Sequence, residues 1–164
     1  MEKQPIRLSA HGYATTDPSV TFTRIVAIDL TTVFTGHGVL PAVVEVTKGH
    51  REWTGTGAVR AVTFSDRGEV LERLTGYEPA ARYAYEATNF TNVLRFLVSG
   101  ARSEWSFRPD LKGGTVIEWD YTFHPLPGRT GIVRALLAKP WKRYIEEVLL
   151  RTVTQIEEGT VRAS

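Results

Sequence analysis

The sequence predicts an α+β fold in which a curved antiparallel sheet of about six to seven strands surrounds one long C-terminal helix, with two short helices after the first strand. Residues 55–125 contain five short alternating or aromatic-rich runs, each closed by Gly, Pro or Asp. A long amphipathic stretch comes next and ends the chain. A flat sheet cannot bury its apolar face against a single helix, so the sheet must curl around it. Curling leaves room for a small-molecule cavity.

The composition is that of one ordinary globular domain. The chain has 164 residues, 42% hydrophobic and 23% charged, and no cysteine, which excludes disulfides and cysteine-ligated metals. Its net charge of +2 is too small to predict nucleic-acid binding. No apolar run reaches the length of a signal peptide or a membrane span, and a cytoplasmic location fits. We expect residues 1–18 to be a flexible or loosely attached arm, at most a short edge strand, and residues 19–164 to be a single domain.

The first elements after the arm are predicted to be one strand and two short helices. Residues 19–28 alternate and are rich in β-branched side chains, which predicts the first strand. Asp29 is placed as the N-cap of a helix that must be short, because Gly36 and Gly38 interrupt it. Pro41 is expected to begin a second short helix.

Alternating runs between turn residues predict the remaining strands, which form an antiparallel meander. These strands are expected at residues 53–65, 69–75, 82–88, 101–108 and 115–124. Residues 89–99 fit either a strand or a connecting turn. A hairpin turn is predicted at residues 65–68, with Gly68 free to take a positive φ.

The closing segment predicts a long amphipathic helix in two parts. Its apolar residues recur at spacings of three and four between residues 132 and 156. Pro140 removes one backbone hydrogen bond, so a kink or break is expected there. Glu147 and Arg151 are spaced to form an ion pair on the exposed side.

The order of these elements and two sequence stretches carry a resemblance to a known superfamily. The stretches are GAVRAVTFSDRGEVLERLTGYEP and GGTVIEWDYTFHP, at residues 57–79 and 113–125. Residues 19–158 resemble the helix-grip fold of the START/SRPBCC superfamily, in particular its polyketide cyclase/dehydrase-like branch. The resemblance implies a ligand pocket between the curved sheet and the last helix. It does not choose among polyketide cyclases, lipid carriers, hormone sensors and co-chaperone domains, which all share the fold.

Arg60 and Glu72 are the candidate polar residues of such a pocket. Arg60 interrupts an apolar strand and shares a face with Val62 and Phe64, and Glu72 shares a face with Leu74 on the next strand. If these faces are concave, the guanidinium could bind a carboxylate, a phenolate or an enolate, with Glu72 as its partner. The alternative is a structural ion pair or a group at a wet sheet edge, because burying either charge unpaired would cost several kcal/mol.

Large aromatic residues at alternating positions supply the other candidate lining. Residues 117, 119, 121 and 123 are predicted to face inward, with the intervening acids outward. Such residues are core more often than ligand wall, yet their number favours a flat, apolar or aromatic ligand. The candidate ligand-binding residues are Arg60, Val62, Phe64, Glu72, Leu74, Tyr85, Trp105, Phe107, Trp119, Tyr121 and, covering the cavity from the helix, Tyr144 and Val148. The catalytic candidates are Arg60 and Glu72.

No metal site or familiar catalytic motif is predicted. The four histidines form no His-x-His or His-x-x-x-His pair, so no metal ligation is expected. His37 and His50 are assigned to surface loops, with a general-base role as the less favoured interpretation. No Gly-x-Ser-x-Gly elbow, P-loop or dinucleotide fingerprint is present, and no cofactor is expected.

A basic run with interleaved apolar residues covers residues 129–143. It could contact a membrane surface or a partner, although a solvated helix face with core contacts is the favoured interpretation. The expected partner is a hydrophobic small molecule and not a nucleic acid, and the expected state is a monomer or weak homodimer.

Three functions remain open on this evidence. The first is a carrier, sensor or scavenger of a hydrophobic, aromatic or lipid-like molecule. The second is a cofactor-independent enzyme that resembles a polyketide aromatase/cyclase, in which Arg60 stabilises an enolate. The third is an interaction module of the co-chaperone type, whose side chains would fill the interior and leave no ligand-sized void.

Overall fold

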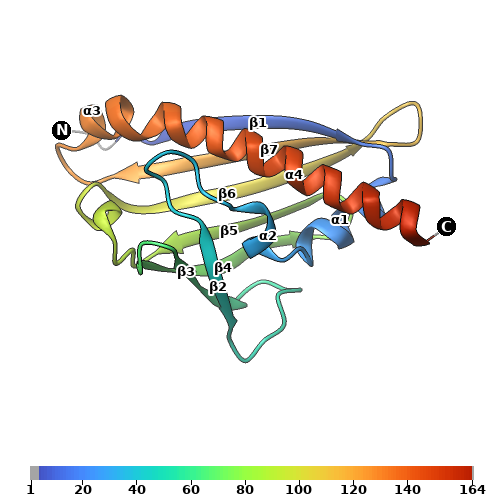
Figure 1. Ribbon diagram of the computed structural model, residues 1–164, viewed down its shortest axis with the longest axis horizontal. Coiled ribbons are helices and arrows are strands. Elements are labelled where there is room, and N and C mark those ends of the chain that lie inside the picture. The colour runs from blue at the N-terminus through green and yellow to red at the C-terminus, as the bar shows by residue number, and fades with distance from the viewer. Residues whose placement is uncertain (1–3, 164) are drawn as a thin grey trace.

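A seven-stranded antiparallel sheet curves around the C-terminal helix (Figure 1). The computed structural model describes residues 4–163, with side chains described as far as residue 158. The strand order is β1-β7-β6-β5-β4-β3-β2. The strands are β1 (Ile6–Ala14), β2 (Val43–Lys48), β3 (Val59–Phe64), β4 (Glu69–Glu78), β5 (Arg82–Thr88), β6 (Val98–Pro109) and β7 (Thr115–Pro125). The predicted fold class is confirmed.

Short helical segments connect the strands, and one long helix closes the chain. They are α1 (Pro18–Val26), α2 (Leu30–Val33), the 3-10 turn η1 (Val93–Phe96), α3 (Thr130–Val133), the π turn η2 (Arg134–Ala138) and α4 (Lys139–Ala163). Among these residues, no helix is both long enough and apolar enough to cross a membrane.

Strand β1 replaces the flexible N-terminal arm and matches the alternative of an edge strand, because it lies at the edge of the sheet beside β7. It pairs antiparallel with β7 along its whole length, from Ile6 opposite Phe123 to Ala14 opposite Thr115. Helix α4 packs against this strand so closely that a Cβ atom on Gly12 would lie 3.2 Å from Leu149. The strand therefore carries small residues where other strands carry large apolar ones, and its sequence shows little alternation.

Helix α1 replaces the strand predicted at residues 19–28. The Asp17 side chain caps it by accepting a hydrogen bond from the Val20 backbone N–H at 3.0 Å, and Pro18 occupies the first turn. These two start signals outweigh the β-branched composition. Phe22 projects from the helix into the aromatic core of the sheet and is fully buried.

The two short helices predicted after this segment have different outcomes. Asp29 caps α2 as predicted, accepting a hydrogen bond from the Thr31 backbone N–H at 3.0 Å. The helix expected to begin at Pro41 is wrong, because this segment forms β2, the edge strand that pairs with β3. Val43 is buried and Val44 exposed, as neighbours in a strand must be. Their β-branched side chains suit a strand better than a helix.

The β3–β4 hairpin lies where predicted, but a different residue adopts the left-handed conformation. Arg67 has a φ of 70°, and Gly68 does not have a positive φ. Gly68 is required for space instead, because an added Cβ would clash with the Asn92 side chain. Strand β4 continues into the turn expected at residues 76–79 and ends at Glu78, with a register irregularity after Leu74.

Alternation correctly predicts the inner face of the central strands. Along β7, residues 117, 119, 121 and 123 are buried, and the residues between them are partly exposed. Trp105 of β6 stacks on Trp119 of β7 with ring centroids 4.3 Å apart. The concave face of the sheet is therefore an aromatic layer, and α4 covers it.

The closing helical run changes its winding before Pro140, and it is not broken there. Residues 134–138 form the π turn η2, and α4 begins at Lys139. Pro140 has no N–H for a carbonyl of the preceding turn, and the change of winding in that turn accommodates it without ending the helical run. The predicted pair of Glu147 and Arg151 is present at 3.9 Å.

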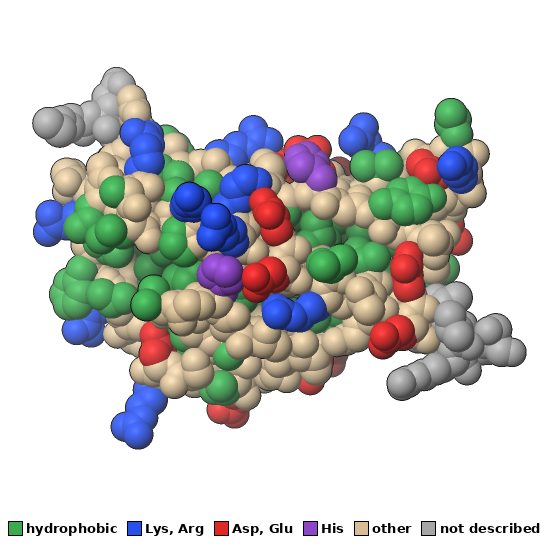
Figure 2. Space-filling view, turned by 45° about the horizontal axis from the view of Figure 1, so that its top comes forward, with side chains coloured by type: hydrophobic (Ala, Val, Ile, Leu, Met, Phe, Trp, Pro, Cys, Tyr) green, Lys and Arg blue, Asp and Glu red, His purple; other side chains and the backbone are tan. Residues whose placement is uncertain are grey.

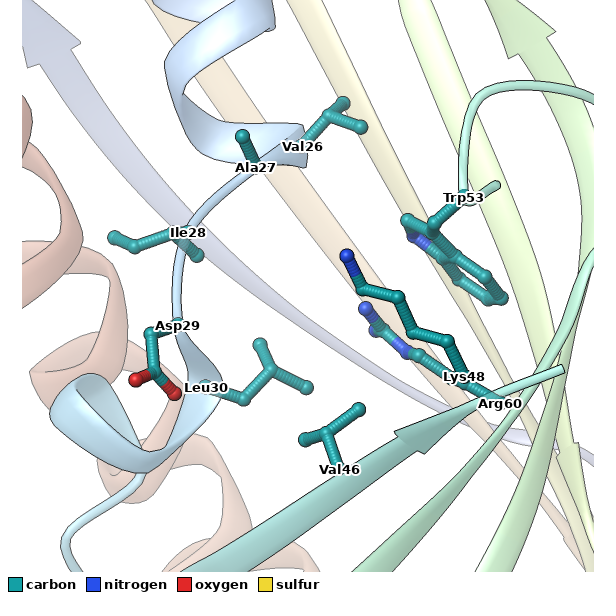
Figure 3. Close-up of a pocket in the computed structure, with 9 residues that line it drawn as sticks. All are labelled: Val26, Ala27, Ile28, Asp29, Leu30, Val46, Lys48, Trp53 and Arg60. Carbon is teal, nitrogen blue, oxygen red and sulfur yellow. The ribbon is translucent and has the colours of Figure 1, made fainter. Parts of the chain in front are cut away.

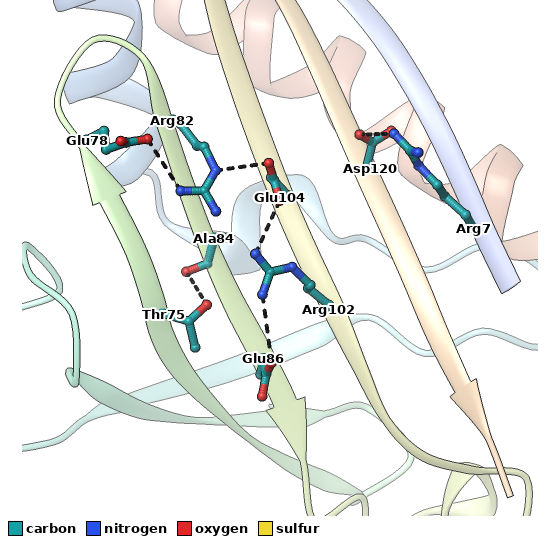
Figure 4. A network of polar contacts seen from close by, with 9 residues as sticks. All are labelled: Arg7, Thr75, Glu78, Arg82, Ala84, Glu86, Arg102, Glu104 and Asp120. Atoms are coloured by element: carbon teal, nitrogen blue, oxygen red, sulfur yellow. Dashed lines mark hydrogen bonds and ion pairs between the residues drawn. The ribbon is translucent and has the colours of Figure 1, made fainter. Parts of the chain in front are cut away.

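A charged network covers the outer face of the sheet (Figure 4). Arg82 binds Glu104 at 2.9 Å and Glu78 at 3.3 Å, and Arg102 binds Glu104 at 3.3 Å and Glu86 at 3.8 Å. Exposed ion pairs of this kind contribute little individually, about 0–1 kcal/mol each. These arginine and glutamate side chains lie on the face of the sheet opposite the aromatic layer.

We expect Glu104 to stabilise the fold at neutral pH and to lose this contribution in acid. Its hydrogen bond from Arg82, helped by Arg102, holds the pKa of Glu104 below its ordinary value. A carboxyl with a lowered folded-state pKa stabilises the protein above its unfolded pKa of about 4.3 and loses this effect as the pH falls through the folded value. In urea titrations, the free energy of unfolding of Glu104→Gln should therefore be lower than that of the parent at pH 7 and equal to it at about pH 2. A pH-independent difference would contradict this.

Candidate functional site

The candidate site is built around a buried ion pair near the open end of the β3–β4 hairpin. Arg60 and Glu72 lie directly opposite each other in the strand register. Arg60 Nε donates to Glu72 Oε1 at 2.6 Å, and the two side chains are only 8% and 10% exposed. The predicted pairing is therefore confirmed, and both groups lie on the inner side of the sheet.

Aromatic rings hold the Arg60 guanidinium in place. Its Cζ atom lies 3.9 Å from the centre of the Trp53 ring and 5.3 Å from that of Tyr85, both within cation–π range. Burial alone would lower the pKa of Arg60, but the charge and the hydrogen bond of Glu72 oppose this, and the pKa is raised. The group is therefore a permanent cation inside the protein.

A cavity of about 250 Å³ opens beside Arg60 (Figure 3). Its walls are the connection between α1 and α2 at residues 26–30, Val46 and Lys48 of β2, and the Trp53 ring. Lys48 lies opposite Arg60 in the β2–β3 register and is exposed, so it stands at the rim while Arg60 lies deeper. Figure 3 shows the nitrogen ends of both side chains directed into this space.

The cavity wall carries two cations, Lys48 and Arg60, and one carboxylate, that of Asp29. The Asp29 carboxylate accepts hydrogen bonds from the Thr31 backbone N–H at 3.0 Å and from the Thr31 hydroxyl at 2.7 Å. Within the described residues, Arg60 uses Nε for Glu72, and its terminal nitrogens make no hydrogen bond. Two cations with free N–H groups therefore face the cavity, and the arrangement suits an anionic or strongly polarised oxygen.

The other predicted lining residues lie in the aromatic layer and the adjoining core. Phe34 fills the space between sheet and helix, with its ring centroid 6.1 Å from that of Trp119 and 5.6 Å from that of Tyr144. Arg60 alone among the twelve candidates lines the described cavity. The remaining candidates are buried or partly buried around it: Val62, Phe64, Glu72, Leu74, Tyr85, Trp105, Phe107, Trp119, Tyr121, Tyr144 and Val148.

Buried polar atoms in this layer are donors, not bases. Burial raises the pKa of Tyr83, Tyr85 and Tyr121, so their hydroxyls stay protonated at neutral pH. The indole Nε1 atoms of Trp105 and Trp141 are buried without a hydrogen-bond partner in the described part of the chain. None of these five residues lines the cavity beside Arg60.

Of the nine residues that line the cavity, sequence reasoning identified Arg60 as a site residue and missed the other eight, among them Lys48 and Trp53. Recognising residues 43–48 as a strand would have placed Lys48 on the same face as Arg60. His37 is half-buried, bonds Glu147 Oε1 through Nδ1 at 3.1 Å, and does not line the cavity, and His50 is exposed. The described residues contain no group of three His, Cys, Asp or Glu side chains that could hold a metal ion.

The curved sheet, the closing helix and the cavity beside β3 define a helix-grip protein. The chain belongs to the family described as "Polyketide cyclase / dehydrase and lipid transport", whose model matches residues 18–157. The family and the fold support ligand binding. A search of curated protein sequences found no match to this chain.

Solved structures share the fold at low sequence identity. The crystal structure of Ara h 8.0201 has a TM-score of 0.69 at 15% identity, covering 94% of this chain and 99% of its own. TTHA0849 from Thermus thermophilus has a TM-score of 0.70 at 14% identity, with the same coverages. Norcoclaurine synthase from Thalictrum flavum, in complex with a transition state analogue, has a TM-score of 0.70 at 13% identity, covering 98% of this chain and 99% of its own.

Proposed function

We propose that the protein binds a hydrophobic, partly aromatic small molecule whose anionic end lies against Arg60 and Lys48. The observation that carries this proposal is the buried guanidinium, which gives one N–H to Glu72 and turns its terminal nitrogens to the cavity. These terminal nitrogens are not among the buried donors that lack a partner in the described residues, so they are accessible from the cavity. A carboxylate or similar oxyanion would satisfy them with charge-assisted and bidentate bonds.

The size and lining of the cavity support a compact ligand. Its volume of about 250 Å³ is just below the roughly 300 Å³ at which typical small-molecule sites begin. The apolar side chains of Val26, Ile28 and Leu30 form one wall, and the Trp53 ring forms another. A ligand with one flat apolar portion and one acidic group matches this wall, and a longer molecule would place only its polar end here.

The enzyme alternative uses the same guanidinium, which would stabilise an enolate. It also requires a group that takes up a proton next to the substrate. Glu72 is bonded to Arg60, and the raised pKa of Tyr85 keeps that hydroxyl protonated. These features favour binding over turnover. The interaction-module alternative predicted an interior filled by side chains. Phe34 does fill the space between the sheet and α4, and the cavity beside Arg60 is the feature that favours a ligand over this alternative.

We expect the protein to prefer 2-naphthoate over 2-naphthylmethanol, which has the same rings without the charge. A charge-assisted hydrogen bond contributes about 1.5–3 kcal/mol, so the preference should be about 10- to 100-fold. Saturation-transfer NMR and quenching of tryptophan fluorescence would measure both affinities. Native mass spectrometry after mild purification would report any acidic molecule that co-purifies.

Matched variants separate the site from general charge effects. Lys48→Ala and Arg60→Lys should each weaken 2-naphthoate binding, because the first removes a cation and the second replaces a planar fork with a point charge. Arg108→Ala, at an exposed position of β6, should leave binding unchanged. Equal affinity for the two naphthalenes, or equal losses in all three variants, would overturn the proposal.

A further inference from the structure

Two segments far apart in the sequence leave apolar side chains exposed at one end of the molecule. Val93 and Phe96 of η1 are 66% and 55% exposed, and Ile132 and Leu136 of the closing helical run are 43% and 65% exposed. Figure 1 places the yellow-green turn of η1 and the orange helix α3 at the same end of the molecule. Figure 2 shows hydrophobic side chains gathered there. We call these four residues the terminal patch.

Specific bonds hold the two segments together. The Leu126 backbone N–H donates to the Leu97 carbonyl at 2.9 Å, and Arg129 Nε donates to the Phe96 carbonyl at 3.3 Å. Leu94 and Leu137, one from each segment, are buried in the core. The terminal patch is therefore displayed by an anchored part of the fold, and its side chains are not exposed by fraying.

Several cations near the terminal patch have no acidic partner in the described structure. Neither residues 87–103 nor residues 121–145 contain an Asp or Glu, although the whole chain has a net charge of only +2. Carboxylates outside these ranges do bond to them: Asp66 accepts from Asn92 at 3.2 Å, Glu146 pairs with Lys142 at 2.6 Å, and Glu86 and Glu104 pair with Arg102. The surrounding cations are Arg95, Arg129, Arg134, Lys139 and Arg143, and the described structure contains no ion pair to any of them.

We propose that this end of the protein docks on an anionic lipid bilayer. Phe96 and Leu136 would enter the headgroup region, and the flanking cations would face lipid phosphates. From Arg134 to Arg143 the cations extend over about 14 Å of helix at roughly 1.5 Å per residue, and they do not converge on one point. A distributed charge beside an apolar wedge matches a continuous anionic surface better than a single anionic group. This proposal is independent of the ligand cavity.

Vesicle flotation with the full chain tests the proposal. We expect binding to vesicles of phosphatidylcholine with about 30% phosphatidylglycerol, which resemble an anionic leaflet, and no binding to pure phosphatidylcholine. Binding should weaken as salt rises, because the Debye length falls from about 10 Å at 0.1 M to about 3 Å at 1 M. A Phe96→Trp variant should show a blue-shifted emission on the anionic vesicles only.

Two paired variants assign the contact to this end. Each basic residue near an anionic surface contributes about five-fold to partitioning, so Arg134→Ala with Arg143→Ala should reduce binding about 25-fold. Arg73→Ala with Arg108→Ala makes the same charge change at exposed positions of β4 and β6 and should have little effect. Phe96→Ser with Leu136→Ser should abolish the remaining binding, with circular dichroism confirming an unchanged fold.

Several outcomes would overturn the proposal. One is no binding to the anionic vesicles at low salt, and another is equal binding to neutral vesicles without salt dependence. Equal losses in the two arginine pairs would show that only net charge matters. A dimer that Phe96→Ser with Leu136→Ser dissociates, without vesicle binding, would assign the terminal patch to self-association. Lys48→Ala should not alter vesicle binding, although it should weaken 2-naphthoate binding. The two proposals can therefore be refuted separately.

Discussion

Replacing Trp119 with alanine should lower the free energy of unfolding by about 3–5 kcal/mol, the range for a large buried aromatic side chain. The indole is completely buried and stacks on Trp105, with Phe34 and Tyr121 edge-on to it. Its removal would leave a cavity in the aromatic layer that strands on both sides prevent from collapsing. The same change removes the hydrogen bond from Trp119 Nε1 to Ser103 Oγ at 2.7 Å.

Guanidinium or urea titration with matched variants would measure this effect. Ser103→Ala should cost about 1–3 kcal/mol, because it leaves the buried indole N–H without an acceptor. Leu111→Ala, at a fully exposed position, should change the free energy of unfolding by no more than about 0.5 kcal/mol. A loss below about 1 kcal/mol for Trp119→Ala would mean that the layer repacks, in contrast to the rigid stacking described here.

The aromatic layer was predictable because one rule of strand geometry governs it. In β5, β6 and β7, alternation with period two places every second residue on the inner face, and β5 occupies residues 82–88 as predicted. The opposed positions of Arg60 and Glu72 followed from the same rule applied across a short hairpin. These inferences depend only on neighbours in sequence and on one turn.

The N-terminal elements were not predictable from alternation because tertiary packing determines them. Strand β1 carries small residues so that α4 can approach, which removes the apolar signal of a strand. At α1, the β-branched residues after Ser19 suggested a strand, and the Asp17–Pro18 start signal was the better guide. The β-branched composition of this segment predicts a strand, whereas the N-cap Asp17 and Pro18 predict the helix that is observed.

The location of the cavity was not predictable either, for a related reason. Alternation indicates which side chains face inward, but it does not show which of them meet. Phe34, from the connection after α2, occupies the space between Trp119 and Tyr144 where a pocket was expected. The described cavity lies beside it, where Arg60 meets the α1–α2 connection. An empty volume depends on contacts between distant segments, and no single stretch of sequence records these.

Removing the Glu72 carboxylate while keeping Arg60 should be among the most destabilising single changes in this protein. Glu72→Leu would leave a buried guanidinium without its partner, and breaking a buried ion pair costs about 3–5 kcal/mol. The double variant Arg60→Met with Glu72→Leu replaces both charges with apolar groups of similar volume and should recover most of this loss. Arg7→Ala, which breaks the exposed pair with Asp120, should cost less than about 1 kcal/mol in the same urea titration.

The double variant also separates stability from binding. If Arg60 anchors an anionic ligand, this variant should fold with nearly the parent stability and lose the preference for 2-naphthoate over 2-naphthylmethanol. Recovery of stability together with an unchanged preference would remove Arg60 from the ligand site and leave the ion pair a purely structural role. A double variant as unstable as Glu72→Leu alone would instead mean that the contact of Arg60 with Trp53 contributes more to folding than the pairing with Glu72. The two measurements together therefore distinguish an ion pair retained for ligand recognition from one retained for the fold.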